Sequence, residues 1–189
     1  MHAIVDQIVE VFATRGAESY GSEDVTQLEH AMQCGDLARS SKATDELVVA
    51  AVLHDIGHLL LDTPLPTADA SDYDDSHETI GYQFLEQNFG AAVADPVRLH
   101  VAAKRYLCTT RPSYEQQLSP TSYKSYLDQG GKMSKDELAA FESEPHCEAA
   151  LVLRSWDDSA KNMDAKMPTI EDFKPYFFAV LQQQRQIDS

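Results

Sequence analysis

A histidine and an aspartate stand side by side in the most apolar stretch of the chain. The segment VVAAVLHDIGHLLL contains His54, Asp55 and His58. Burying such groups without partners is unfavourable by several kcal/mol or more for an isolated charge. A metal ion removes this cost because it takes up the carboxylate charge and the imidazole lone pairs. A carboxylate has two oxygens, so Asp55 can bridge two cations. The segment therefore predicts a metal site.

Other residues able to bind metal lie on predicted helices before and after this segment. They are His30, His77, His100 and Asp157. Taken singly, a histidine in a helix is more often an ordinary hydrogen-bonded residue than a ligand. His2 and His146 have no comparable setting, and we interpret them in that ordinary way.

Two basic residues share helix faces with these candidates. Lys104 comes one turn after His100, and Arg154 comes three residues before Asp157. Both can be solvated surface cations. Alternatively, they face the same cavity as the candidate ligands and hold a small anion there.

Helical periodicity dominates the regions that must position these residues. We expect helices over 3–14, 26–43, 46–61 with Asp45 as N-cap, 76–89 and 93–110, and further helices starting at Ser119–Pro120, Ser134, Pro145 and Thr169. Residues 62–75 read as an acidic loop, and alternating strand patterns are absent. The expected fold is all-α: a single helical bundle over 1–189 whose central helix carries the His-Asp pair.

Composition narrows the classes of partner. The chain has 189 residues, 43% of them hydrophobic, and a formal net charge of −16. This charge argues against nucleic acid and anionic membranes as partners. Three scattered cysteines, no secretion leader and no membrane-spanning run favour a cytoplasmic protein. We expect a monomer or small homo-oligomer that acts on a small molecule.

The order of His30, the pair His54–Asp55 and Asp157 resembles the HD superfamily, named for that pair. Most members are metal-dependent phosphohydrolases. His77 and His100 match the subset with two metals. The resemblance implies His30, His54, Asp55 and Asp157 on one metal, and Asp55, His77 and His100 on the other.

Three longer segments narrow the resemblance. YGSEDVTQLEHAMQCGDLA, AAVLHDIGH and HVAAKRYL are similar to the HD-domain mixed-valent di-iron oxygenases that cleave organophosphonates. This implies two Fe ions, Fe(II)/Fe(III), with O2 as co-substrate. It also implies that Tyr20 ligates the second iron before substrate arrives, with Glu23 as its partner on a mobile lid. The same ligands can hold Mn or Zn, and the motif offers no thiolate.

The same resemblance places the phosphonate at four residues: His58, Lys104, Ser122 and Arg154. His58 and Lys104 are also expected to be catalytic, and Ser119 and Ser125 are alternatives to Ser122. The acidic loop with Tyr73 can hold a cationic end of the substrate, although most of its charges are explained by solvation alone. This favours a 2-trimethylammonio substrate that gives glycine betaine, with the 2-amino compound that gives glycine as the alternative.

Two other functions remain open at this point. One is an HD phosphohydrolase that acts on a phosphoester or nucleotide and needs no O2. The other is a non-catalytic metal-binding signalling module, which would be expected to have lost some ligands, whereas here all six positions are filled.

Overall fold

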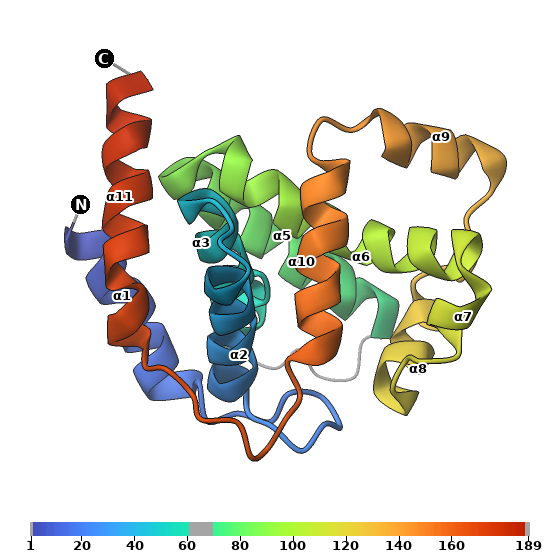
Figure 1. Cartoon of the computed structure of the whole chain (residues 1–189), viewed down its shortest axis with the longest axis horizontal. Helices are drawn as coiled ribbons and strands as arrows, with labels where there is room; N and C mark the ends of the chain where they lie inside the picture. The colour runs from blue at the N-terminus through green and yellow to red at the C-terminus, as the bar shows by residue number, and fades with distance from the viewer. Residues whose placement is uncertain (1, 61–69, 188–189) are drawn as a thin grey trace.

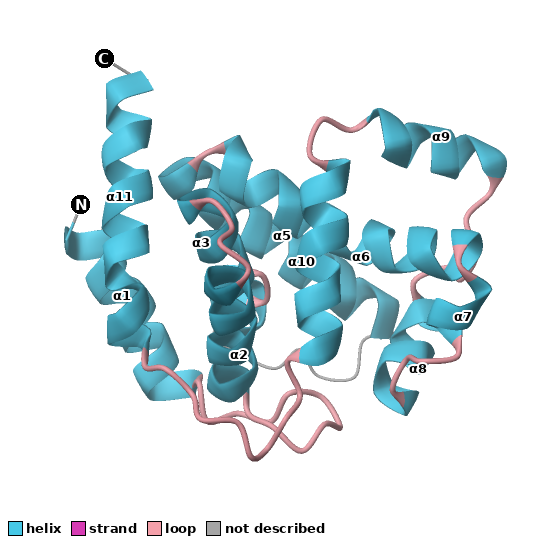
Figure 2. Cartoon of the chain, in the orientation of Figure 1, coloured by secondary structure: helices cyan, strands magenta, loops and turns pink. Residues whose placement is uncertain are grey.

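The regular structure is helical throughout the residues that the structure describes. The computed structural model describes the backbone of 2–60 and 70–187 and the side chains of 3–60 and 78–186. Within them, the only extended pairing is an isolated bridge between Ser19 and Thr26 (Figure 2). The helices are α1 (His2–Arg15), α2 (Gln27–Ser40), α3 (Asp45–Leu53), α4 (Ile56–Leu60), α5 (Ala70–Phe89), α6 (Ala91–Thr110), α7 (Pro112–Glu115), α8 (Pro120–Asp128), α9 (Lys135–Ser143), α10 (Cys147–Ser159) and α11 (Ile170–Ile187). The all-α prediction is confirmed.

Helix α3 forms the centre of the bundle. All of its residues from Val48 to Leu53 are buried, and it contacts α2, α6, α10 and α11. Figure 1 shows α1 and α11 on one side of this centre and α7, α8 and α9 on the other. The central position follows from a segment that is apolar on nearly every face. Among the described residues, no helix is long and apolar enough to cross a bilayer.

The expected continuous helix over 46–61 is wrong, because it is interrupted at the His-Asp pair. Helix α3 ends at Leu53 and α4 begins at Ile56. The N–H of His58 donates to the carbonyl of Asp55 at 3.0 Å, three residues back, so the chain is wound more tightly here than in an α-helix. Hydrophobic periodicity does not detect such a local change. His54 and Asp55 therefore lie in a turn.

The start of this helix also differs from the prediction. Thr44, not Asp45, is the N-cap, and its hydroxyl accepts from the N–H of Leu47 at 3.4 Å. Asp45 is the first helical residue, where a carboxylate is favourable next to the positive helix end.

The expected loop over 62–75 is helical from Ala70 onward, so α5 starts before Ser76. Its first residues, ASDYDD, are rich in aspartate. A segment rich in aspartate is usually a loop, yet aspartate also stabilises the first turn of a helix. The remainder of that loop and the side chain of Tyr73 lie outside the described residues.

Helix starts elsewhere follow the predicted caps. Ser119 caps α8, Ser134 and Glu137 form the capping box of α9, and α11 follows Thr169. Helix α10 starts at Cys147, two residues after Pro145, and the short α7 was not predicted. A second capping box, formed by Thr26 and Glu29, was also not predicted. It fixes the residue at which α2 starts, and thereby the position of His30 along that helix.

Candidate metal centre

Three histidine rings turn the same nitrogen toward one small volume. In each ring, Nδ1 lies next to a backbone carbonyl oxygen: His30 with Ala160 at 2.9 Å, His54 with Ala51 at 3.0 Å, and His100 with Val97 at 2.5 Å. A ring that donates from Nδ1 keeps the Nε2 lone pair available for a cation. The backbone thus selects the tautomer that metal binding requires.

Two of these nitrogens face each other. Nε2 of His30 and Nε2 of His54 are 3.2 Å apart, and both rings are buried. In the absence of a cation, one of them must carry a proton. Burial lowers the pKa of His54, but the carboxylates of Asp55 and Asp157 outweigh it and raise that pKa to about 9. A metal ion bound by both Nε2 atoms would replace the proton between His30 and His54.

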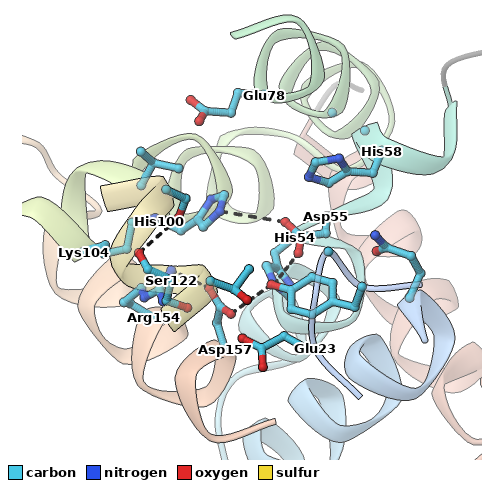
Figure 3. A pocket seen from close by; sticks show the side chains of 18 of the residues that line it. Glu23, His54, Asp55, His58, Glu78, His100, Lys104, Ser122, Arg154 and Asp157 are labelled. Atoms are coloured by element: carbon cyan, nitrogen blue, oxygen red, sulfur yellow. Dashed lines mark hydrogen bonds and ion pairs between the residues drawn. The ribbon is translucent and has the colours of Figure 1, made fainter. Parts of the chain in front are cut away.

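Asp55 presents one oxygen to each side of the cluster. Its Oδ2 lies 3.2 Å from Nε2 of His54 and 3.9 Å from Nε2 of His30. Its Oδ1 faces Nε2 of His100 at 3.9 Å. The turn between α3 and α4 produces this placement (Figure 3). One carboxylate directed at His30 and His54 on one side and at His100 on the other has the arrangement of a bridge between two cations.

Asp157 completes the group around His30. Its Oδ1 lies 3.4 Å from Nε2 of His30, and its Oδ2 is 2.7 Å from Nη1 of Arg154. Burial raises the pKa of Asp157, but Arg154 outweighs it and holds the pKa well below its usual range. Asp157 is therefore a permanent carboxylate, as a metal ligand must be.

Arg154 is held on three sides. Beyond Asp157, its Nη2 pairs with Asp158, and its Nε donates to the hydroxyl of Tyr114 at 3.1 Å. Tyr114 in turn donates to Asp158. The guanidinium lines the cavity, and it also orients the candidate ligand Asp157.

Tyr20 covers the cluster from a tight turn. Its ring stacks on His30 with centroids 3.8 Å apart, and its hydroxyl donates to Oδ1 of Asp157 at 3.3 Å. Burial, followed by Asp157 and Asp55, raises the pKa of Tyr20 well above its ordinary value. The Ser19–Thr26 turn places this ring directly before α2. Its roles as an iron ligand and as a mobile lid stay predictions.

A cavity of about 400 Å³ opens onto these groups. The structure brings all four expected phosphonate contacts to its wall: His58, Lys104, Ser122 and Arg154. Lys104 is buried, and its Nζ donates to Oγ of Ser125 at 2.7 Å. Figure 3 shows Lys104, Ser122 and Arg154 gathered on one side of Asp55, with Glu78 and His58 at the opposite end. The volume suits a small molecule.

Comparison with known proteins agrees with this geometry. The HD domain family matches residues 27–129. A hydroxymethylphosphonate dioxygenase of Gimesia maris is 44% identical over 169 residues, which cover 89% of this chain and 84% of that protein. The chain belongs to the HD-domain phosphonate dioxygenases. A second member of this family, the [1-hydroxy-2-(trimethylamino)ethyl]phosphonate dioxygenase (glycine-betaine-forming) of Leisingera caerulea, is 40% identical over 172 residues, 91% of this chain and 87% of that protein.

The expectation that the motif of this HD-domain dioxygenase offers no thiolate needs one addition. Cys34 places a thiol at the centre, with Sγ 3.7 Å from Nε2 of His30, and it lies within reach of both His30 and His54. The spacing of four residues from His30 on one helix was the available signal. Burial, then Asp157 and Asp55, raises the pKa of Cys34 well above its ordinary value, so the group stays a thiol.

Two further residues complete the comparison with the sequence. His77 lies in helix α5, but its side chain is outside the described residues, so its role as a ligand stays a prediction. Lys161 was not predicted, yet it lines the cavity beside Ser122. It follows helix α10 in an irregular segment, where periodicity gives no direction for a side chain.

Proposed function

We propose that this chain uses two iron ions, Fe(II) and Fe(III), and O2 to cleave the C–P bond of a small 1-hydroxyphosphonate. The products are a carboxylate and inorganic phosphate. The observation that carries the proposal is the two-sided placement of Asp55 in a cavity that also contains buried Lys104 and Arg154. A bridged pair of metals beside fixed cations is suited to redox chemistry on an anionic substrate.

The geometry and the family resemblance both support one assignment of the ligands. His30, His54, Asp157 and Oδ2 of Asp55 surround one position. Oδ1 of Asp55 and His100, with His77, would serve the second. The family resemblance also gives Tyr20 to the second metal before substrate binds, whereas its hydroxyl here donates to Asp157, beside the first position. Mixed imidazole and carboxylate ligands suit iron and leave positions open. When bound, the irons supply O2 activation and accept electrons from the substrate.

The residues of the cavity wall bind and orient the phosphonate. Lys104 and Arg154 are both buried, so their charges act at short range with little screening by water. Ser122 adds a hydroxyl beside them, and His58 adds an imidazole at the opposite end of the cavity. Because the charge on the phosphorus group remains when the C–P bond breaks, these residues stabilise the departing phosphate. We assign His58, which lines the cavity, the role of moving a proton at the 1-hydroxyl.

The reaction balances without an added reductant. Hydroxymethylphosphonate and O2 give formate, hydrogen phosphate and one proton. The carbon is oxidised from an alcohol to a carboxylate, and O2 is reduced. The C–P bond breaks as carbon–oxygen and phosphorus–oxygen bonds form.

The group attached to C1 distinguishes three candidate substrates. Glu78 lines the cavity, and so does Glu18, whose carboxylate is paired with Arg15. Carboxylates suit the ammonium group of both the 2-trimethylammonio and the 2-amino compound, and the glycine-betaine-forming relative favours the 2-trimethylammonio compound first. The relative from Gimesia maris adds hydroxymethylphosphonate. Measuring kcat/KM for all three compounds, with phosphate as the readout, ranks them.

The decisive experiment compares O2 uptake with phosphate release. Iron-loaded protein is mixed with each 1-hydroxyphosphonate, with and without air. We expect one O2 consumed for each phosphate formed, and no phosphate under argon. Phosphate release from phosphoesters under argon would instead indicate a hydrolase, and the proposal would be abandoned.

A further inference from the structure

Helix α2 brings a cysteine as well as a histidine to the candidate metal centre. Cys34 follows His30 by four residues, so the two side chains lie on the same face of the helix, one turn apart. Sγ of Cys34 lies 3.7 Å from Nε2 of His30. Together with a ring nitrogen of His54, these ligand atoms all lie within 4.8 Å of one another. Two imidazoles and one thiol therefore converge on one position.

The distances between these atoms match the edges of a tetrahedral metal site. Zinc binds imidazole nitrogen at about 2.0–2.1 Å and thiolate sulfur at about 2.3 Å. In a tetrahedron, these bond lengths separate two nitrogens by about 3.3 Å and nitrogen from sulfur by about 3.6 Å. The observed separations are 3.2 Å between Nε2 of His30 and Nε2 of His54, and 3.7 Å between Nε2 of His30 and Sγ of Cys34. Oδ2 of Asp55, at 3.2 Å and 3.9 Å from the two Nε2 atoms, supplies a fourth ligand.

Cys34 reaches this position from within the protein. Its side chain is completely buried, whereas His54 and Asp55 line the cavity. A bound ion can therefore engage the thiol without disturbing the groups that face the substrate. The other two cysteines differ from it, because Cys108 is buried on α6 and Cys147 is only partly buried at the start of α10.

We propose that Cys34 is a ligand for zinc and similar thiophilic divalent ions at the first metal position. The site then consists of His30, Cys34, His54 and Asp55. In the metal-free chain Cys34 is a thiol. As the metal–sulfur bond forms, the S–H bond breaks and its proton passes to water. A thiolate adds to the general preference of nitrogen and oxygen sites for zinc over Fe(II).

The consequence for iron rests on the proposed function. A zinc ion held by Cys34 occupies the position of one iron, and zinc has no redox chemistry. The ligands proposed for iron at this position are His30, His54, Asp55 and Asp157, so Cys34 favours the inactive ion alone. The chain is thus sensitive to zinc by construction, and it has to be loaded with iron where free zinc is scarce.

Cobalt(II) reports a bond to sulfur directly, because a thiolate ligand gives it an intense charge-transfer band in the near ultraviolet. The full chain is treated with a chelator, checked by circular dichroism, and titrated with one equivalent of Co(II) under argon. We expect the band in the wild type and none in Cys34→Ser. Cys147→Ser removes the partly buried cysteine and should keep the band at wild-type strength.

Competition between metals gives a second measurement. Each protein is incubated with equal amounts of Zn(II) and Fe(II) under argon, and the bound metals are counted by elemental analysis. Cys34→Ser should lower the ratio of bound zinc to bound iron at least about tenfold, because only zinc loses a ligand. Cys147→Ser should match the wild type.

X-ray absorption of the wild type keeps the inference testable if Cys34→Ser does not fold. With one equivalent of zinc, we expect one sulfur neighbour at about 2.3 Å from the ion. A spectrum with nitrogen and oxygen neighbours only would overturn the inference. So would a cobalt band of equal strength in the wild type and Cys34→Ser, or an unchanged ratio of zinc to iron.

These measurements record metal binding and not turnover. A chain that binds cobalt through sulfur but cleaves no C–P bond would contradict the proposed function and leave the role of Cys34 intact. A chain that cleaves the bond but binds cobalt without sulfur would do the reverse.

Discussion

At the scale of single residues, the candidate metal centre depends on which ring nitrogen of each histidine is not engaged by the backbone. Backbone carbonyls engage Nδ1 of His30, His54 and His100, so their Nε2 atoms converge. Among the described residues, Asp55 differs from these histidines because its two oxygens face both His54 and His100. Arg154 differs because it contacts the candidate ligand Asp157 and also lines the cavity. These distinctions predict different consequences of substitution.

Asp55→Asn should abolish binding of both metals. The amide has no charge and only one oxygen able to ligate, so it cannot bridge. We expect iron content to fall from two per chain to less than one, and kcat/KM to fall at least about hundredfold. Elemental analysis and O2 uptake measure the two effects. His146→Asn is a suitable control, since His146 lies away from the cluster beside Asp95. Two retained irons in Asp55→Asn would rule out the bridging role.

Tyr114→Phe should weaken the centre indirectly. It removes the acceptor of Arg154 Nε and the donor to Asp158, so the guanidinium that holds Asp157 loses a support. We expect metal affinity or kcat/KM to fall about 10–100-fold, as is usual for groups that orient a ligand. A competition titration with a chelator measures the affinity. Tyr123→Phe, on the exposed face of α8, should have no effect. Equal losses in both variants would contradict this role for Tyr114.

At the scale of elements, the site needs α2 and α3 to approach closely. A side chain on Gly35 would meet Cγ2 of Val52 at 2.5 Å and the ring of Phe173 at 2.8 Å. The absence of a side chain thus allows α2, α3 and α11 to pack at this point. His30 and the His-Asp turn are brought together by the same contact between α2 and α3.

Gly35→Ala should therefore destabilise the fold, although alanine favours helices. Crowding of a well-packed core costs about 1–3 kcal/mol, which outweighs a gain of about 1 kcal/mol in helix propensity. Urea unfolding followed by circular dichroism measures the difference. A variant as stable as the wild type would mean that α11 can move away without loss.

The start of α9 should give the protein an acid-sensitive element. The N–H of Ser134 and then Arg105 lower the pKa of Glu137 from 4.5 to about 2. A lowered pKa in the folded state means that the ionised form stabilises the fold above pH 4.5. This contribution is lost as the pH falls toward 2. Glu137→Gln should thus be less stable than the wild type at pH 6, and the gap in melting temperature should close near pH 2. A gap independent of pH would contradict this account.

At the scale of the whole molecule, periodicity was enough to predict a helical bundle, and the family resemblance named most of the residues that gather at the candidate metal centre. Helical spacing places Lys104 near His100 and Arg154 near Asp157, because residues on one face point the same way. Helical spacing in the sequence could not predict that Lys161 lines the cavity or that the chain turns at Asp55. Both depend on irregular backbone, where no period applies. The hydroxyl of Tyr114 reaches Arg154 only through the packing of α7 on α6, which is a tertiary effect.

Metal binding should stabilise the whole molecule, because the candidate ligands that the structure describes come from α2, the α3–α4 turn, α6 and α10. Only the folded chain brings these elements together, so metal favours the folded state. At a metal concentration of about 100 times Kd, the gain is about 2.7 kcal/mol, or roughly 5–10 °C in melting temperature for a domain of this size. Calorimetry on chelator-treated protein, with and without added Fe(II) under argon, measures the shift. Asp55→Asn should show a much smaller shift, whereas Lys124→Gln should match the wild type. An equal shift in Asp55→Asn would mean that the stabilising metal binds elsewhere.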